Sequence, residues 1–583
     1  MLYGQYRWRN REIRHQVEVL DGKRSPTLLL KNATYLNGIL KTWMQGNIWI
    51  YHDRIVYVGD RLPGYMDESC EIIDCSEYFL VPGYIEPHAH PAQVYNPLSF
   101  AQYAVQSGTT TLINDNLQLA FFMEKREAFT FISDLHQIPV NMYWWCRLDS
   151  QTFLPWEERK FTNQTFKEWI DQETVVQAGE LTSWPRLLDG DGLLLHWLRE
   201  TKRKNKKVEG HFPGASEKTL AKLKLFGADG DHEAINGEEV MRRLLQGYMV
   251  SLRHSSIRPD LPDILQDLNE RGLNSYDYLM FTTDGSTPSF YEQGVIAPLI
   301  KIAMDHGVPE IDAYLMATLN PAKYFQLDHI HGLIGTGRVA DINFLTDVKN
   351  PEPFSVLAKG RWVKKNDQPL DFYDAQTIPW ERYGFHPLII DWELTADDLS
   401  VSIPFGIELE NTVITKPYSP VLDMSLETIP EEYAECFFIL IDRRGKWRVS
   451  SIIKGFAKDL GGMATSFTAS GDLLLIGKNK EDIIIAFHRL KELHGGIVIV
   501  EGGKILFELA LPLLGQMSTL PLQQLIPFEK RFVQLMKKKG YPFHDPLYTL
   551  MFFTSIHLPY VRVTPAGVYE VKKKRVLFPS VMR

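Results

Sequence analysis

The chain has 583 residues, of which 44% are hydrophobic and 23% are charged, so it is long enough for two or three domains with large buried cores. A formal net charge of -9 leaves no broad basic face to neutralise phosphates, which argues against a nucleic-acid-binding protein. Four cysteines and no CxxC pair exclude a disulfide framework and a zinc ribbon, and they fit a reducing compartment.

The N-terminal segment shows no targeting feature. Its first residues, MLYGQYRWRNREIRHQ, are charged and lack the apolar core of a signal peptide. No uninterrupted apolar stretch is long enough to span a bilayer, so we expect a cytoplasmic protein with no membrane partner. The lysine runs between Lys202 and Lys207 and at Lys537–Lys539 are short, and we interpret them as solvated faces.

Residues 27–60 predict a small β module. The segments LLLKNATYLNG and GNIWIYHDRIVYVGD alternate apolar and polar residues around a polar turn at His52-Asp53. The stretch HGLIGTGRVADINFLTD, from His331 to Asp347, returns to this alternation. We expect it to rejoin the module, giving a β-sandwich built from segments on both sides of the central domain.

Around and after Val81, strand-like segments alternate with helical ones. The predicted strands are YFLVPGYIEPHAH, GTTTLINDN, IPVNMYWWCRLD, TVVQAGELT, KVEGHF, GADGDHE, GYMVSLRH and YLMFTTDGST. Helical patterns between them include SFAQYAVQSG, LLLHWLRETKRK, SEKTLAKLKLF, EEVMRRLLQG and DILQDLNERG. Eight strands alternating with helices over about 200 residues fit a (β/α)8 barrel, although a doubly wound open sheet alternates in the same way.

Polar residues at the strand ends favour the barrel. Candidates from seven different strands lie at their C-terminal ends: His88 and His90, Asp115, Glu180, His211, His232, His254 and Asp284. In a closed barrel these ends converge on one mouth, where active sites form, whereas an open sheet would scatter them along a line. The expected order is therefore residues 1–80 with the first part of the β module, a barrel at 81–330, a return to the module and a linker at 331–396, and an α/β domain at 397–583.

The candidate residues also suit a pair of metal ions. Two ions about 3.5–4 Å apart need histidine and carboxylate ligands and a bridging group, and Glu180 is able to bridge. Singly, each residue has a plainer explanation: Glu180 near a helix N-terminus, His232 in a surface loop, Asp284 in an Asp-Gly turn. Together, their types and order predict a two-metal hydrolase.

Several motifs resemble the bacterial adenine deaminase family of the amidohydrolase superfamily. VPGYIEPHAH is similar to the opening signature of the superfamily, and the long segment from Val208 to Arg253 resembles the deaminases more narrowly. MATLNPAKYFQL, GTGRVADINFL and the late GGIVIVEGGKILFELALPL extend the resemblance over almost the whole chain.

The resemblance implies metal-dependent hydrolysis of a cyclic amidine C–N bond, adenine plus water giving hypoxanthine plus ammonia. It implies that His88 and His90 hold one ion, that His211 and His232 hold the other, that Glu180 bridges them, and that Asp284 lies beside the bridging hydroxide as the proton acceptor. Manganese or iron is expected, with zinc an alternative. Substrate contacts are expected from Gln118, Asp115, Ser286 and, more weakly, His254. Family analogy also implies a homo-oligomer.

Three stretches depart from the family pattern. Asp-Pro-His-Glu becomes Asp115-Asn116-Leu117-Gln118, and Asp-Asp-Arg-His becomes Asp284-Gly285-Ser286-Thr287. A late His-Asp-Ser-His-Asn becomes Thr468-Ala469-Ser470-Gly471-Asp472. Gln118 can donate a hydrogen bond but cannot act as a general acid.

Three alternatives follow from these departures. Small residues after the last barrel strand would open space for an N6-substituted adenine such as N6-methyladenine. The missing acid at position 118 and the lost late histidines would suit a purine-binding paralogue without turnover. Cleavage of a cyclic amide would leave the deaminase-like segments unexplained. The aromatic run MYWWCR, from Met142 to Arg147, is expected in the barrel core, although a tryptophan can stack on a purine.

Overall fold

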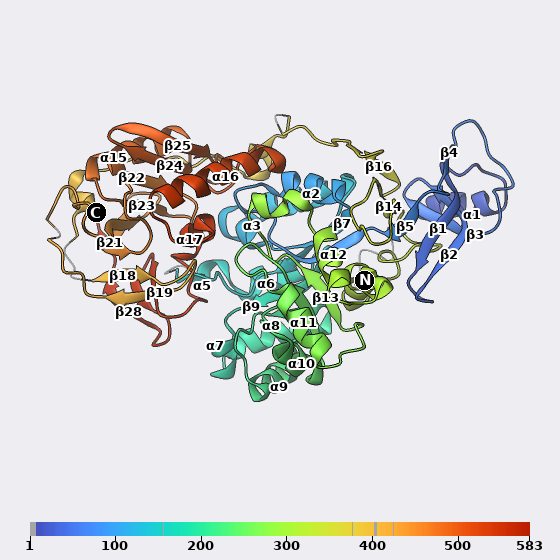
Figure 1. Ribbon diagram of the computed structural model, residues 1–583, viewed down its shortest axis with the longest axis horizontal. Coiled ribbons are helices and arrows are strands. Elements are labelled where there is room, and N and C mark those ends of the chain that lie inside the picture. The colour runs from blue at the N-terminus through green and yellow to red at the C-terminus, as the bar shows by residue number, and fades with distance from the viewer. Residues whose placement is uncertain (1–6, 155–156, 376, 402–404, 424) are drawn as a thin grey trace.

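A computed structural model describes residues 7–154, 157–375, 377–401, 405–423 and 425–583. Figure 1 shows three parts in a row: the N-terminal strands at one end, a barrel in the centre and the C-terminal domain at the other end. None of the described helices is long and apolar enough to cross a membrane.

The central part is a barrel of eight parallel strands, and every pair of neighbours in sequence is also paired in space. The strands are β6 (Tyr84–Ala89), β7 (Thr109–Asn114), β8 (Asn141–Cys146), β9 (Val175–Leu181), β10 (Lys207–Gly210), β11 (Gly230–Asp231), β12 (Met249–Arg253) and β13 (Leu279–Thr282). All residues of β6 to β9 are buried, as expected for strands covered on both faces. Trp144 and Trp145 are fully buried core residues of β8. The (β/α)8 prediction is confirmed.

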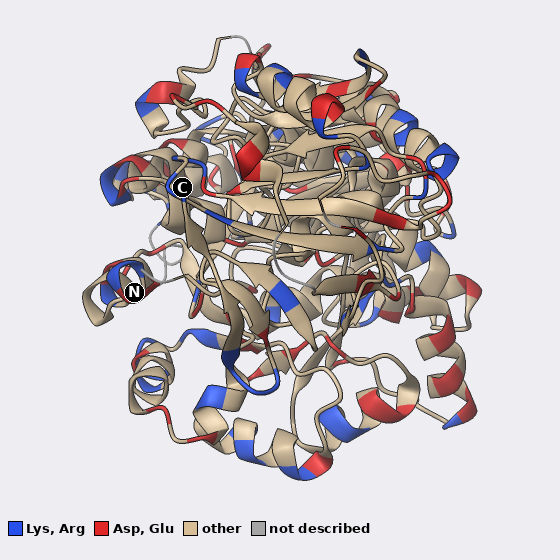
Figure 2. Ribbon diagram, turned by 90° about the vertical axis from the view of Figure 1, so that its left-hand side faces the viewer, with Lys and Arg blue, Asp and Glu red and all other residues tan. Residues whose placement is uncertain are grey.

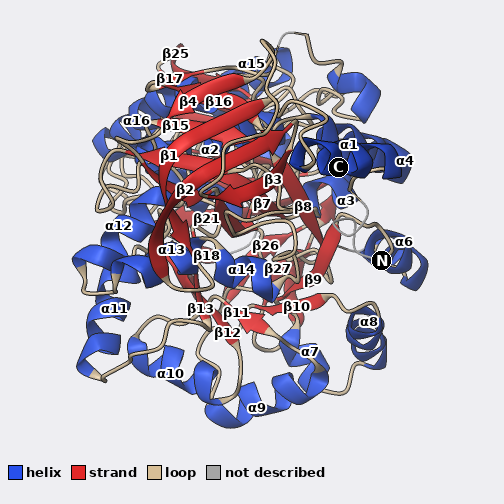
Figure 3. Ribbon diagram, turned by 90° about the vertical axis from the view of Figure 1, so that its right-hand side faces the viewer, coloured by secondary structure: helices blue, strands red, loops and turns tan. Residues whose placement is uncertain are grey.

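Helices surround the barrel, and Figure 3 shows several of them as an outer ring around the strands. They are α2 (Pro97–Gln106), α3 (Leu117–Phe122), α4 (Lys125–Asp134), α5 (Glu157–Lys160), α6 (Asn163–Ile170), α7 (Trp184–Leu188), α8 (Gly192–Arg203), α9 (Glu217–Phe226), α10 (Gly237–Leu245), α11 (Leu261–Glu270), α12 (Ala297–Asp305), α13 (Glu310–Ala317) and α14 (Leu319–Tyr324). Local chemistry sets their ends: the Ser216 side chain accepts from Thr219 N at the start of α9, and Gly227 ends it with φ 113°.

The first predicted barrel strand is wrong in one respect, because it divides at Gly83. Residues before the glycine form β5 (Phe79–Pro82), which belongs to the N-terminal sheet, and residues after it form β6. A Cβ at position 83 would lie only 2.1 Å from Thr110 Oγ1, so the backbone approaches β7 more closely than a side chain would permit.

The N-terminal sheet combines strands from before and after the barrel. Its path is β17-β16-β15-β14-β5-β1-β2-β3, with β4 also paired to β1. The other bounds are β1 (Leu28–Asn37), β2 (Thr42–Tyr51), β3 (Arg54–Gly59), β4 (Glu71–Asp74), β14 (Ile342–Leu345), β15 (Ser355–Ala358), β16 (Arg361–Lys365) and β17 (Gln368–Pro369). The junction is the antiparallel pair β5–β14, in which Val81 faces Asn343. Helix α1 (Asn10–Leu20) precedes these strands.

The C-terminal part holds a second mixed sheet, in the order β19-β18-β21-β20-β23-β22-β24-β25 with β29 on β21, and a separate sheet β26-β27-β28. The strands are β18 (Gly406–Leu409), β19 (Thr415–Tyr418), β20 (Glu435–Ile441), β21 (Trp447–Lys454), β22 (Gly462–Thr465), β23 (Leu473–Gly477), β24 (Gly496–Glu501), β25 (Lys504–Ala510), β26 (Val561–Thr564), β27 (Gly567–Glu570), β28 (Arg575–Pro579) and β29 (Val581–Met582). Its helices are α15 (Lys480–Glu492), α16 (Leu522–Lys538) and α17 (Pro546–Phe552). Figure 2 shows acidic and basic residues interspersed over the face at this end.

Candidate metal centre and substrate cavity

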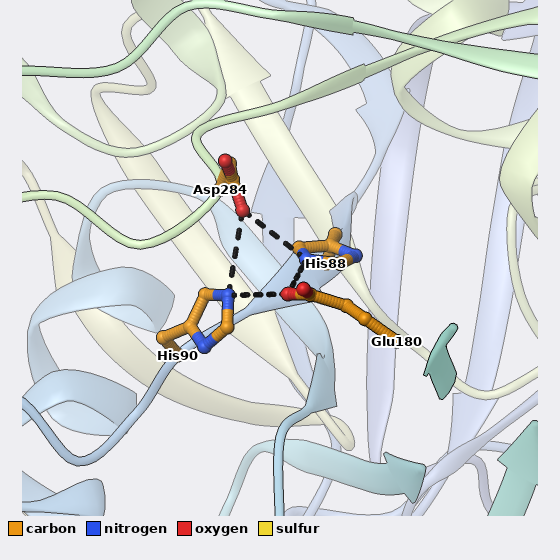
Figure 4. A group of neighbouring side chains, drawn as sticks. All are labelled: His88, His90, Glu180 and Asp284. Atoms are coloured by element: carbon orange, nitrogen blue, oxygen red, sulfur yellow. Dashed lines mark hydrogen bonds and ion pairs between the residues drawn. The ribbon is translucent and has the colours of Figure 1, made fainter. Parts of the chain in front are cut away.

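Four predicted ligands meet at the C-terminal mouth of the barrel (Figure 4). His88 Nε2 lies 3.1 Å from Glu180 Oε1 and 3.2 Å from Asp284 Oδ1. His90 Nε2 lies 3.3 Å and 3.4 Å from the same two oxygens. One ligand atom from each residue therefore falls within a sphere that a single cation can occupy, since all four lie within 4.8 Å of one another.

A second group of donors lies beside the first and shares Glu180 with it. His211 Nδ1 is 3.4 Å from Glu180 Oε2 and 3.2 Å from His232 Nε2. The ligand atoms of these three residues also lie within 4.8 Å of one another. Because Glu180 turns one oxygen to each group, the arrangement offers two adjacent cation positions with one carboxylate between them.

The donor set fits divalent cations of the Mn, Fe or Zn type. Histidine nitrogens and carboxylate oxygens are ligands that all three accept, and rigid strand ends present them from five separate strands. Glu180, His88 and His232 are almost completely buried, and a buried carboxylate such as Glu180 needs a compensating positive charge.

Asp115 holds His90 from behind. Its Oδ2 lies 3.0 Å from His90 Nδ1 and accepts a hydrogen bond from Arg147 Nη2 at 2.6 Å, and its Oδ1 accepts one from Trp145 Nε1 at 2.8 Å. A carboxylate on the far nitrogen of a ligating histidine fixes the orientation of its ring. Asp115 borders the cavity, as a predicted substrate contact would, but its side-chain hydrogen bonds are with His90, Trp145, Arg147 and Leu117 N.

Two arginines neutralise the remaining carboxylates. Arg253 Nη1 donates to Glu233 Oε1 at 2.6 Å and also to Asp284 Oδ2. Arg258 Nη1 contacts the other oxygen of Glu233 at 2.7 Å. Glu209 lies behind His232, with Oε1 3.3 Å from His232 Nδ1, in the place that Asp115 takes behind His90.

These contacts set the protonation states. Burial alone would raise the pKa of Glu180, but Arg147 and then His88 hold it well below the usual value. Burial opposes protonation of His88, yet hydrogen bonds to Asp284 and Glu180 raise its pKa to about 9. Burial lowers the pKa of His232. Cation binding must therefore displace a proton from His88, so metal affinity rises with pH.

A cavity of about 560 Å³ opens beside the two groups, within the range of small-molecule sites. Its barrel side includes His90, Asp115, Gln118, His211 and Asp284. Its opposite side comes from the C-terminal part of the chain: Asn411, Thr412, Val413, Ile414, Ala469, His544, Tyr548, Met551, Phe552, Ser555, His557, Leu558 and Pro559. The site is thus enclosed by two parts of the chain that are far apart in sequence.

The predicted substrate contacts divide into two groups. Gln118 lines the cavity, and its Oε1 is buried without a hydrogen-bond partner among the described residues. Ser286 is buried away from the lining and donates to Thr283 O at 3.2 Å. His254 is also outside the lining, with its ring 5.6 Å from that of Phe290.

Sequence reasoning missed several groups that complete the site. Glu209 lies on β10, two positions before His211, and Glu233 directly follows His232, so their closeness to the ligands could be read from the sequence. Arg147 directly follows β8 and Arg253 is the last residue of β12, and position at a strand end was the signal used for the other candidates. His557 could not be recognised in this way, because it follows no barrel strand and reaches the cavity from the C-terminal part of the chain.

Comparisons with known proteins identify the family of the chain. Residues 79–365 match the profile of the Amidohydrolase family, and residues 413–575 match the Adenine deaminase C-terminal domain. The chain is 52% identical to a protein of Halalkalibacterium halodurans named "Putative adenine deaminase", over 99% of each chain. A protein of the same name from Bacillus cereus is 53% identical over 99% of this chain and 97% of its own. The "Adenine deaminase" of Listeria welshimeri is 26% identical over 96% and 97%. The chain belongs to the adenine deaminase family of amidohydrolases.

Proposed function

We propose that this hydrolase deaminates adenine at a site with two divalent metal ions. The observation that carries the proposal is the convergence of His88, His90 and Asp284 on one oxygen of Glu180, and of His211 and His232 on the other side. Family membership and the names of the relatives supply the substrate.

The metal ions would be held in two groups that share a carboxylate. His88, His90 and Asp284 would bind one ion, His211 and His232 the other, and Glu180 both. Bound divalent ions supply a water whose pKa is lowered toward neutrality. Asp115 and Glu209 keep the rings of His90 and His232 in place, because each contacts the ring nitrogen that faces away from the cluster.

Asp284 is the group that moves the proton. Burial opposes its ionisation, but Arg253 and then His232 hold its pKa well below the usual value, so the carboxylate is ionised at neutral pH. It can take a proton from the attacking water and return it to the amino group at C6, which leaves as ammonia. Adenine and water are thereby converted to hypoxanthine and ammonia with all atoms balanced.

Gln118 is the substrate contact that the structure supports best among the sequence candidates. The residue lines the cavity while its Oε1 is buried without a partner among the described residues, so the amide nitrogen is the group left to donate to a purine edge.

An N6-substituted adenine remains a second candidate, but the loop after β13 adds no room for it. Ser286 faces away from the cavity, and Tyr548 from the C-terminal part lines the space, with its hydroxyl donating to Gly285 O. At position 285 itself, an added Cβ would lie 2.6 Å from His90 Cβ, so that space is already filled by His90. Discrimination between adenine and N6-methyladenine depends on the rest of the cavity.

The deciding experiment is turnover by the manganese-reconstituted chain on adenine and N6-methyladenine, followed by purine absorbance and by assay of the released amine. His88→Ala is expected to lose more than about 100-fold in kcat/KM, because even groups behind a ligand contribute 10- to 100-fold. His196→Ala, a histidine of the outer helix α8, is the control and should match the wild type. Bound metal without any hypoxanthine from either substrate would contradict the proposal and favour a purine-binding protein without turnover.

A further inference from the structure

The C-terminal wall of the cavity contains a histidine, His557, that has no role in the proposed deamination. Ala469 is one of the lining residues, so the stretch in which the sequence departs from the family's late histidines does face the substrate space. His557, almost ninety positions later, lines the same cavity. An imidazole therefore reaches the site from a different segment.

His557 lies directly against the second group of metal ligands. Its ring centroid is 5.4 Å from that of His211, with the planes at 86°, and 5.5 Å from that of Phe552. Its Nδ1 is buried with no hydrogen-bond partner among the described residues. Because the ring lines the cavity while Nδ1 is closed off, the edge that carries Nε2 is the one turned to the substrate space.

The backbone around His557 is fixed to the barrel. Ile556 N donates to Gln151 O at 2.9 Å, and Thr152 Oγ1 donates to Thr554 O at 2.7 Å. The side chain of Gln151 in turn donates to Glu180 Oε2 at 2.8 Å. The position of the His557 ring is therefore set relative to the bridging carboxylate before any ligand binds, which limits the entropy lost on binding.

A role as a metal ligand does not match the geometry. Among the described residues, His557 belongs to none of the groups of histidines and carboxylates whose ligand atoms lie within 4.8 Å of one another. A purely structural role does not explain why the ring borders the cavity. An imidazole with one free edge in the same cavity lining as Gln118 has the features of a substrate contact, because Nε2 can donate or accept a hydrogen bond according to the tautomer.

We propose that His557 contacts the purine ring through its Nε2 edge and so completes the substrate site from the C-terminal part of the chain. This proposal rests on the proposed function, because it takes a purine as the occupant. The purine would then be bound between two parts of the chain: Gln118 from the barrel and His557 from the C-terminal part.

The test compares His557→Phe, which keeps a ring, with His557→Gln, whose amide reaches toward the Nε2 position. Manganese content, melting temperature, kcat and KM for adenine, and calorimetric titration with hypoxanthine are measured on each full-length variant. His488→Ala is the matched control, since this histidine of α15 is exposed.

His557→Phe is expected to bind hypoxanthine roughly 10- to 100-fold more weakly, the effect of one lost buried hydrogen bond to a ligand, with unchanged metal content. His557→Gln should recover part of that loss. Hypoxanthine affinity of His557→Phe within twofold of the wild type would overturn the proposal, and so would a loss of bound manganese in both variants. A wild type that binds hypoxanthine but releases no ammonia would overturn the proposed function alone, and the titrations would still decide the role of His557.

Discussion

Asp115→Asn tests whether the carboxylate behind His90 is needed for metal binding. Asp115 faces the His90 ring at 3.0 Å and accepts hydrogen bonds from Trp145 Nε1, Leu117 N and two nitrogens of Arg147. Asparagine keeps the shape but replaces one acceptor oxygen with a donor. At least one of these donors then loses its acceptor.

The expected losses in stability and in metal affinity depend on the groups that still surround Arg147 and His90 in the variant. Removing one partner of a buried ion pair costs about 3–5 kcal/mol of the free energy of unfolding. Glu180 Oε2 lies 3.6 Å from Arg147 Nη1 and remains as a counter-charge, so we expect the lower end. Loss of support for the His90 ring should weaken metal binding about 10- to 100-fold, which is about 1.4–2.7 kcal/mol.

The assay is manganese titration together with urea unfolding of the metal-free protein. Asp149→Asn is the matched control, because Asp149 is a buried carboxylate nearby that accepts from Thr182 and Ser183 and contacts neither His90 nor Trp145 in any hydrogen bond above. Manganese affinity of Asp115→Asn within twofold of the wild type would refute the reasoning, as would an equal loss in the control.

Three further predictions concern the same site and its surroundings. Chelation should lower the melting temperature and added manganese should restore it, since a ligand at 100 times its Kd stabilises the folded state by about 2.7 kcal/mol; an unchanged melting temperature would contradict a structural metal pair. Gly285→Ala should lose manganese, because φ is +57° and the added Cβ would lie 2.6 Å from His90 Cβ; full metal occupancy would contradict this. Burial raises the pKa of Asp545 to about 6, so between about pH 4 and pH 6 the folded state keeps a proton that the unfolded chain releases. The free energy of unfolding therefore falls by up to about 3 kcal/mol as the pH rises through this range. Asp545→Asn keeps a helix-capping residue at α17 and should raise the melting temperature at pH 8, whereas a lower value would contradict the assigned burial effect.

The barrel and the convergence of the ligand candidates were predictable, because both depend on a local rule. Strand ends can be recognised from apolar runs, and a parallel barrel gathers all its C-terminal ends at one mouth. The same rule explains why His88 and Asp284, almost two hundred positions apart, were expected together. The break at Gly83 was not expected, since apolar pattern alone does not show which sheet a strand joins.

The surroundings of the ligands were less predictable. Ser286 and His254 follow strand ends like the other candidates, yet their side chains turn toward Thr283 and Phe290, because direction within a loop depends on packing rather than on position. The wall that contains His557 depends on how the C-terminal part docks on the barrel. No periodicity in the sequence encodes that docking.

The pairing of β5 with β14 has a consequence for how the chain is made. Val81 leaves the ribosome long before Asn343, its partner in the sheet, so β5 has no strand on that side while the whole barrel is synthesised. The β1–β5 pairing is available early, but the sheet is completed only after about 260 residues have intervened, and such late, distant contacts slow folding. During synthesis the N-terminal strands therefore carry an open edge, and we expect nascent chains that end before β14 to be the most prone to aggregation.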